Sequence, residues 1–271
     1  MEESRFIEMI KRNPSIITTI NNPTNEMKLL ALKKNGLLLR SIKNPTKEME
    51  EVALQNNVRA IQYIDEPSED MMIKAVSEGW SILDYIKNPT DKVIRLAIDK
   101  SGWAIQYVKN PSEELQLLAI KKNYDSIKYI QNPSERVQEE SVKISYDALR
   151  YIKLPSFNTQ LVAIKNNESA IRFIHDINKN KIMEFLKVNI LVIKHIPREV
   201  YKEVKLEELQ EILKLVLSSE TVKEKYVRDF LNCTVIDRNS DVFKMDKILF
   251  IYKYGSKKAK QIAVDEKLKI I

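Results

Sequence analysis

The sequence predicts an all-α fold, an α-solenoid of about nine 22-residue two-helix repeats with a C-terminal helical cap. Seven of the nine prolines stand 22 residues apart, at positions 23, 45, 67, 89, 111, 133 and 155. Counting each of these prolines as position 0, position 8 is alanine in every repeat but one, and position 16 is always Leu or Ile. Position 18 is tyrosine in five successive repeats. Such self-similarity at a fixed period is typical of repeat architectures.

The first half of each repeat has the pattern of a helix that begins beside the proline. Asn before the proline and Ser or Thr after it can cap free N–H groups, proline suits a first turn, and the acids that often follow favour the positive end of the helix dipole. Apolar residues at positions 4, 8 and 9 share one helical face. Because position 8 is so small, we expect a neighbouring backbone to approach it closely.

The second half predicts a shorter helix. Position 12 is Asn, Ser or Gly in every proline-headed repeat. These residues tolerate the left-handed conformation that often closes a helix, so we expect that conformation here. Positions 15, 16 and 19 are expected to face the core, and the next proline should stop the helix.

The period extends beyond the prolines at both ends. Asn13 and Ile17 keep positions 12 and 16 before Pro23, and Asn189 and Ile193 keep them after Ile177, which replaces an expected proline. The predicted array therefore covers residues 1–198, with repeats starting near 1, 23, 45, 67, 89, 111, 133, 155 and 177. Since neither helix can bury its apolar face alone, stability must come from stacking the repeats, and we expect essentially no sheet.

Residues 199–271 lose the register and are predicted to form a helical capping region with a basic tail. Helices are expected at 206–217, 222–231 and 242–254. The end of the chain resembles a first helix again, with Ser256 at position 1, Ala263 at position 8 and Val264 at position 9. The exposed end of a solenoid needs a cover of this kind.

The Asn-Pro boundary, the Ala-aliphatic first helix and the Tyr-Ile second helix resemble the short α-helical repeats of uncharacterised bacterial and phage proteins. More distantly, the pattern is similar to leucine-rich-variant repeats, which pair an α-helix with a 3₁₀-like helix. The resemblance covers residues 1–198 and implies architecture but no active site. The chain lacks the N-terminal cysteine cluster of some leucine-rich-variant proteins, so no iron–sulfur cofactor is implied. Its Lys-, Ile- and Asn-rich composition resembles that of phage or low-GC bacterial proteins.

Composition and charge narrow the function classes. The hydrophobic fraction of 44% and charged fraction of 31% fit a folded protein and disfavour disorder or membrane insertion. We expect a cytoplasmic protein, in the host cytoplasm if it is phage-encoded. The net charge is +7, but residues 244–271 hold eight lysines against three acids, a net +5, so no sustained basic stripe runs through the chain. The single cysteine, Cys233, excludes an intramolecular disulfide and is expected to be buried.

Residues for catalysis are scarce. There are two histidines, of which His195 is expected to pack at position 18 and His175 to be exposed, and no metal-binding motif. The four glycines do not form a phosphate-binding loop. The sequence therefore predicts a protein that is not an enzyme and has no cofactor.

The best candidate surface lies on the second helices. Position 17 should be exposed, and its last four residues, Lys128, Arg150, Arg172 and Lys194, would form a cationic row at repeat spacing. The row is either a binding site or simply a solvated face. The tyrosines beside it, among them Tyr107, Tyr129 and Tyr151, are either a stacking platform or half-buried spacers. Trp80 and Trp103 either mark an interaction hot spot or fill a packing gap.

Three functions follow as hypotheses. The first, which we favour, is a non-enzymatic scaffold that binds another macromolecule, namely a protein, and acts as a phage-encoded inhibitor of a host defence factor. The second is a binder or sponge of an anionic ligand, a cyclic nucleotide or RNA, held by the basic and tyrosine stripe. The third is a homo-oligomeric structural protein assembled through the apolar cap.

Overall fold

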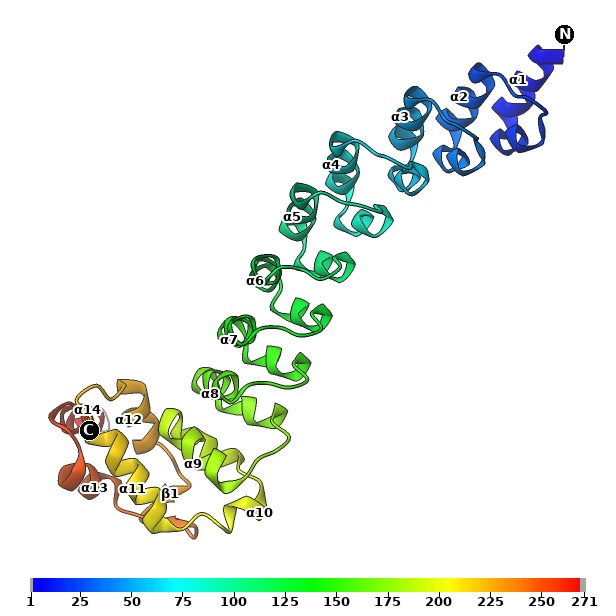
Figure 1. Cartoon of the computed structure of the whole chain (residues 1–271). Coiled ribbons are helices and arrows are strands. Elements are labelled where there is room, and N and C mark those ends of the chain that lie inside the picture. The colour runs from blue at the N-terminus through cyan, green and yellow to red at the C-terminus, as the bar shows by residue number, and fades with distance from the viewer. Residues whose placement is uncertain (1, 269–271) are drawn as a thin grey trace. The chain divides into compact units, whose positions relative to one another are not determined.

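The computed structural model describes residues 2–268 and is an all-α helical-repeat solenoid, as the sequence predicts (Figure 1). Each repeat pairs one α-helix with one six-residue 3₁₀-helix, labelled η. The chain divides into two compact units, an N-terminal unit of residues 1–131 and a C-terminal unit of residues 132–271. Within the described residues, no helix is both long enough and apolar enough to span a bilayer.

The N-terminal unit consists of six α/η pairs in regular alternation. In chain order they are α1 (Glu2–Arg12), η1 (Pro14–Thr19), α2 (Asn25–Lys34), η2 (Gly36–Ser41), α3 (Lys47–Asn56), η3 (Val58–Tyr63), α4 (Glu69–Glu78), η4 (Trp80–Tyr85), α5 (Asp91–Lys100), η5 (Gly102–Tyr107), α6 (Glu113–Lys122) and η6 (Tyr124–Tyr129).

The C-terminal unit begins with three more pairs and continues with helices outside the repeat. The pairs are α7 (Glu135–Ile144), η7 (Tyr146–Tyr151), α8 (Phe157–Asn166), η8 (Glu168–Phe173), α9 (Lys179–Val188) and η9 (Ile190–His195). After them come α10 (Arg198–Tyr201), α11 (Leu206–Leu217), α12 (Glu224–Leu231), β1 (Ile236–Asp237), β2 (Phe243–Lys244), α13 (Lys247–Tyr254) and α14 (Lys257–Leu268). The two short strands pair in parallel and are the one departure from the expected absence of sheet within residues 2–268.

The α-helices of the proline-headed repeats start at the Ser or Thr that the sequence predicts as a cap. The proline does not lie in the first turn, however, and the asparagine before it is not a cap. The position 1 hydroxyl is the N-cap, as where Thr24 Oγ1 accepts from the Met27 N–H at 3.3 Å. Proline stands one residue before this cap instead of in the first turn. The asparagine before it does not cap, and at Asn22, Asn44 and Asn110 it takes φ values of 54°, 45° and 48°, which asparagine tolerates better than most residues.

The expectation of a left-handed residue at position 12 is wrong. Asn35, for example, has φ −150° and ψ 99°, which is extended backbone. Its side chain instead caps the 3₁₀-helix that follows, because Oδ1 accepts a hydrogen bond of 3.1 Å from the Leu37 N–H. Asn57, Ser101, Asn167 and Asn189 do the same in their repeats. The preference for Asn and Ser here therefore reflects N-capping of the second helix.

The core consists of the inward positions that the periodicity predicts. Positions 8, 9 and 16 are buried in every proline-headed repeat, and position 19 is buried or half-buried. The backbone approaches closely at two glycines of the N-terminal unit: a Cβ on Gly36 or Gly102 would lie 2.2 Å from the carbonyl oxygen of Ala53 or Ala119. Both alanines occupy position 8, so the small residue does admit a neighbouring backbone.

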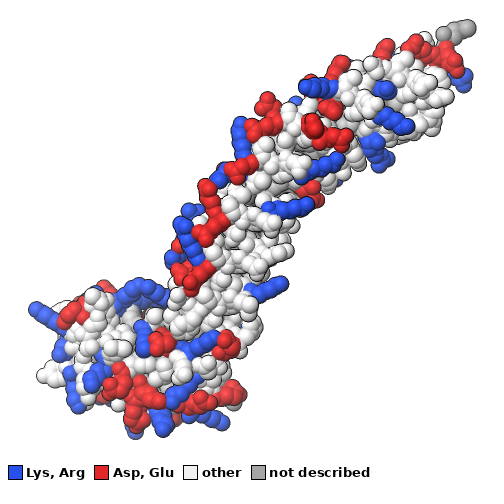
Figure 2. Space-filling model, in the orientation of Figure 1, with Lys and Arg blue, Asp and Glu red and all other residues white. Residues whose placement is uncertain are grey.

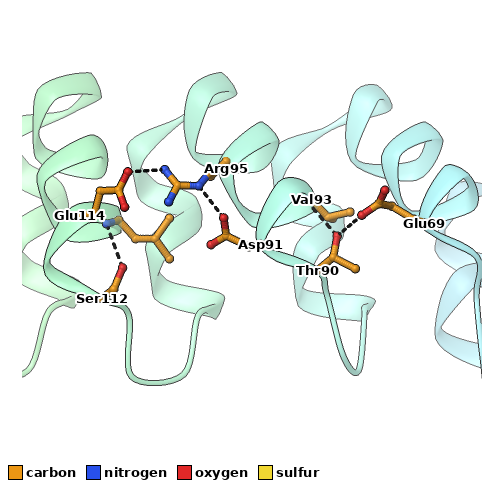
Figure 3. A network of polar contacts seen from close by, with 8 residues as sticks. Glu69, Thr90, Asp91, Val93, Arg95, Ser112 and Glu114 are labelled. Carbon is orange, nitrogen blue, oxygen red and sulfur yellow. Dashed lines mark hydrogen bonds and ion pairs between the residues drawn. The ribbon is translucent and has the colours of Figure 1, made fainter.

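Polar contacts also join neighbouring repeats on the side of the α-helices (Figure 3). Thr90 Oγ1 caps α5 by accepting from the Val93 N–H at 3.4 Å and donates to Glu69 Oε1 of the preceding repeat at 2.7 Å. Arg95 links Asp91 of its own helix at 2.6 Å to Glu114 of the next at 3.0 Å. A single side chain therefore often serves both its own helix and its neighbour.

The residues after η9 pack on the last repeat within the C-terminal unit. Tyr226 of α12 is buried, and its hydroxyl donates to the Leu186 carbonyl oxygen at 2.7 Å. The expected helix at 242–254 begins only at Lys247, because Asp246 Oδ1 caps it by accepting from the Leu249 N–H. Cys233 is buried as predicted.

The last helix matches the repeat only in part. Ser256 Oγ accepts from the Ala259 N–H at 3.1 Å, as a position 1 cap does, and Ala263 is buried. Val264, however, is exposed, whereas position 9 is buried in every proline-headed repeat. The reason is that no further helix covers this face of α14 within the described residues.

Candidate binding surface on the 3₁₀-helices

Three aromatic rings gather on two adjacent 3₁₀-helices of the N-terminal unit. The Trp80 ring of η4 meets the Trp103 ring of η5 edge to face, with centroids 6.4 Å apart. Trp80 also stacks on Tyr107 at 6.1 Å. Trp80 and Tyr107 are half-buried, while Trp103 is 37% exposed. The cluster thus packs one repeat against the next and still offers an indole to solvent.

A charged pair holds Trp103 from the other side. Its Nε1 donates to Asp125 Oδ1 of η6 at 2.8 Å, and Lys128 Nζ lies 2.9 Å from Asp125 Oδ2. The same ammonium lies 5.4 Å from the Trp103 ring centroid and 5.0 Å from that of Tyr129, within the range of cation–π attraction. One lysine therefore contacts two rings and a carboxylate, which fixes the indole in place.

The ionisation of two groups is shifted by this packing. Partial burial opposes the charge on Asp125, but the hydrogen bonds from Trp103 and Lys128 together outweigh it and lower the pKa of that carboxyl. Burial, followed by the nearby charge of Asp84, raises the pKa of the Tyr107 hydroxyl. Asp125 is therefore a carboxylate at neutral pH, and Tyr107 a neutral hydrogen-bonding group.

The cationic candidates are exposed, as position 17 predicts. Lys128, Arg150, Arg172 and Lys194 all present their side chains to solvent. Gln62 is the exception along this row, because it is half-buried. The tyrosines are mostly half-buried, and Tyr129 is more exposed, at 38%.

The C-terminal unit repeats the motif with different residues. The Arg150 guanidinium lies 4.9 Å from the Phe173 ring centroid and 6.0 Å from that of Tyr151. Tyr146 stacks on Phe173 at 6.5 Å. Arg150 and Tyr151 also line a cavity of about 370 Å³, together with His175. A cation over aromatic rings is therefore a recurrent feature of positions 17 and 18.

Sequence reasoning found part of this surface and missed the rest. The candidates that the structure brings together are Trp80, Trp103, Tyr107, Lys128 and Tyr129 in the N-terminal unit and Arg150 with Tyr151 in the C-terminal unit. Arg172 and Lys194 lie on η8 and η9.

The carboxylate of Asp125 and the rings of Tyr146 and Phe173 were not predicted as site residues. The Tyr-Asp pair at positions 13 and 14, present at 124–125 and again at 146–147, was the available signal.

The surface over α4–α6 has a different character. There, blue and red side chains alternate, which is typical of a solvated, internally paired face (Figure 2). The ion pairs of Arg95 and Lys92 with neighbouring acids are examples. Aromatic and cationic groups meet on the 3₁₀ side, so that side is the better candidate for binding.

A scan against protein-family models, a search of curated proteins and a search of solved structures each return no match to this chain. The arguments for function therefore rest on the geometry of the chain alone.

Proposed function

We propose that the protein is a non-enzymatic helical-repeat scaffold that binds a protein partner through the 3₁₀-helices of its N-terminal unit. The observation that carries the proposal is the environment of Trp103, an exposed indole held by Trp80, Asp125 and Lys128 from adjacent repeats. Tryptophan, tyrosine and arginine dominate the residues that contribute most to protein interfaces. A pre-fixed indole loses little side-chain entropy on binding.

The charges of this surface favour a protein over a nucleic acid. Asp84 is exposed on η4, and Asp125 is ionised beside Trp103. Because Asp125 is paired with Lys128, the aromatic rings have no surplus positive charge beside them, whereas binding of a phosphate backbone depends on accumulated positive charge. A polypeptide with apolar and mixed polar side chains does not need such a surplus.

The test uses the intact chain as bait in a pull-down from lysate, followed by affinity measurement with the partner obtained. We expect Trp103→Ala to weaken that partner's binding by about 30-fold, the size of a typical hot-spot loss. Lys128→Glu should weaken it too. Tyr252→Ala removes an aromatic side chain that is 74% exposed on α13 and serves as the matched control. A partner held equally by wild type and Trp103→Ala would contradict the proposed surface.

The cationic row of the C-terminal unit supports a second candidate function, the capture of an anionic ligand such as a cyclic nucleotide or RNA. Arg150, Arg172 and Lys194 are exposed, and none of them forms an ion pair within residues 2–268. Binding of labelled single-stranded RNA should then weaken log-linearly with salt and be reduced by Arg172→Glu. Absence of RNA binding at low salt would exclude this function for RNA. The same titration with a cyclic nucleotide tests that ligand separately.

The third hypothesis, a homo-oligomeric structural protein, is tested by measuring the molecular mass of the protein in solution. Exposed apolar side chains on α13 and α14, Leu249, Tyr252 and Val264, would be the contact. A dimer that Tyr252→Ala and Leu249→Ala convert to a monomer would favour the structural role. Action as a phage-encoded inhibitor of a host defence factor stays a prediction, which the identity of the captured partner would decide.

A further inference from the structure

A small cavity in the C-terminal unit is lined by three lysines, two of which form no ion pair within the described residues. It has a volume of about 270 Å³ and lies where the ends of α8 and α9 meet the segment that joins α11 to α12. Lys165, Lys187 and Lys223 line it, and no Asp or Glu is among its lining residues in the described part of the chain. The hydroxyl groups of Ser219 and Thr221, 2.8 Å apart, line it as well.

The two neighbouring repeats neutralise the lysine at this place, whereas the repeat of Lys165 does not. Lys143 and Lys187 occupy position 10 of their repeats and pair with the acid three residues earlier, Glu140 at 2.7 Å and Glu184 at 2.6 Å. Lys165 occupies the same position in the repeat between them, but the residue three places earlier is Val162. Within residues 2–268, Lys165 and Lys223 form no ion pair.

The two unpaired ammonium groups repel each other across the cavity. The charge of Lys165 is the largest cause that lowers the pKa of Lys223, and burial adds to it. By contrast, the hydrogen bond to Glu140 raises the pKa of Lys143. Lys165 and Lys223 are both exposed, so water screens much of this repulsion, and only a modest cost remains in the unliganded protein. An anion between them would remove that cost, which gives the site a reason to bind one.

The N-terminus of α12 adds a weaker attraction for an anion. Lys223 is the N-cap of this eight-residue helix, and no side chain accepts a hydrogen bond there. The N–H groups of its first turn therefore lack the side-chain cap that the repeat helices have. A helix N-terminus of this kind favours a negative charge.

We propose that this cavity binds the phosphate group of a small ligand. The two unpaired lysines and two hydroxyl groups suit a tetrahedral dianion, and Val188 and Val216 provide an apolar wall for a short organic part. The volume is below the roughly 300–1,000 Å³ of cavities that hold drug-sized molecules, so the organic part must be small. The site shares no residue with the aromatic surface of the 3₁₀-helices and does not depend on the function proposed for that surface.

The test is calorimetric titration of the full chain, at low salt, with inorganic phosphate and with phenyl phosphate as separate probes. We expect saturable binding that Lys165→Gln and Lys223→Gln each weaken at least tenfold. Tighter binding of phenyl phosphate than of inorganic phosphate would indicate a phosphate ester, and the reverse order free phosphate. Absence of saturable binding of both probes to the wild type would overturn the proposal.

Two controls separate this site from general positive charge. Lys143→Gln removes the equivalent but paired lysine of the preceding repeat and should leave binding unchanged. Val162→Glu introduces the acid that the two neighbouring repeats have at this place, without removing a lysine, and should weaken binding as strongly as Lys165→Gln. Equal weakening by Lys143→Gln, or unchanged binding in Val162→Glu, contradicts the proposal.

A measurement on the wild type keeps the proposal testable if a variant fails to fold. The pKa of Lys223, followed by NMR of isotope-labelled lysine, should rise when phosphate saturates the protein, because the anion offsets the repulsion from Lys165. Lys187, which lines the same cavity and is paired with Glu184, is observed in the same spectra. A Lys223 pKa that does not change on saturation would show that phosphate binds elsewhere.

Discussion

Nε1 of Trp103 donates a hydrogen bond of 2.8 Å to Oδ1 of Asp125, a residue 22 positions further along the chain. The two residues belong to consecutive 3₁₀-helices, so the bond joins one repeat to the next. Lys128 Nζ, 2.9 Å from Oδ2, holds the same carboxylate. The position and surroundings of the exposed Trp103 indole therefore depend on the charge of Asp125.

This relationship predicts a pH-dependent change in Trp103 fluorescence. Asp125 has a lowered pKa, so its ionised form stabilises the fold above the ordinary value of 3.8, and this contribution is lost as pH falls through the lower folded-state value. In a Trp80→Phe background, where Trp103 is the single tryptophan, we expect an emission change with a midpoint below pH 3.8. Asp125→Asn should abolish it. A midpoint at or above 3.8, or a transition that persists in Asp125→Asn, would contradict this assignment.

The glycines allow a matched test of packing between repeats. A Cβ on Gly102 would lie 2.2 Å from the Ala119 carbonyl oxygen, so Gly102→Ala must push two repeats apart. We expect a loss of about 1–3 kcal/mol in the free energy of unfolding, typical of overpacking. Gly79 has nothing within 4 Å of the same point and an extended φ of −175°. Gly79→Ala should stabilise by about 0.4–1 kcal/mol, and equal effects of the two substitutions in denaturant unfolding would refute the packing argument.

The prolines and the small and apolar positions of the repeat were enough to predict the solenoid and its core, because burial and helix starts depend on local residue types. The conformation of position 12 was not predictable in this way. Asn suits both a left-handed helix end and an N-cap, and only the short distance to the next helix selects the cap at Asn35. The pairing of Trp103 with Asp125 depends on the lateral spacing of two repeats, which periodicity does not contain.

The lysine cavity shows a different limit of sequence reasoning. Lys165 lies in the repeat array, while Lys223 lies 58 residues further on, beyond the array. No periodicity relates the two, so their approach could not be inferred from spacing. Val162 stands where the two neighbouring repeats have an acid, which is visible in the sequence, but this has a consequence only because Lys223 lies nearby.

Thr90 both caps its own helix and bonds to the preceding repeat, so its replacement should lower the free energy of unfolding more than loss of a cap alone. Thr24 Oγ1 caps α2 alone, so Thr24→Ala should cost about 1 kcal/mol in the free energy of unfolding. Thr90→Ala should cost more, because it also removes the bond to Glu69 of the preceding repeat. Chemical denaturation measures both, and a double mutant of Thr90 and Glu69 gives their coupling. A Thr90→Ala loss no greater than that of Thr24→Ala would show that the bond between the repeats contributes nothing.

Ile127 provides the strictest test of the repeat core. It occupies position 16 and is 1% exposed, so Ile127→Asp places an unpaired carboxylate where no water reaches. Removing a buried isoleucine costs about 2–5 kcal/mol by itself, and the uncompensated charge adds to this. The sum is comparable with the roughly 5–15 kcal/mol that stabilises a whole domain.

We therefore expect Ile127→Asp to unfold at least the repeats around it, with a loss of helical circular dichroism at 25 °C. Leu154→Asp introduces the same carboxylate at a residue that is 88% exposed, and it should change stability by no more than about 0.5 kcal/mol. Because each repeat is stabilised by its neighbours, the damage at Ile127 should spread to adjacent repeats. A folded Ile127→Asp protein with an unchanged, cooperative unfolding transition would mean that position 16 does not form the core.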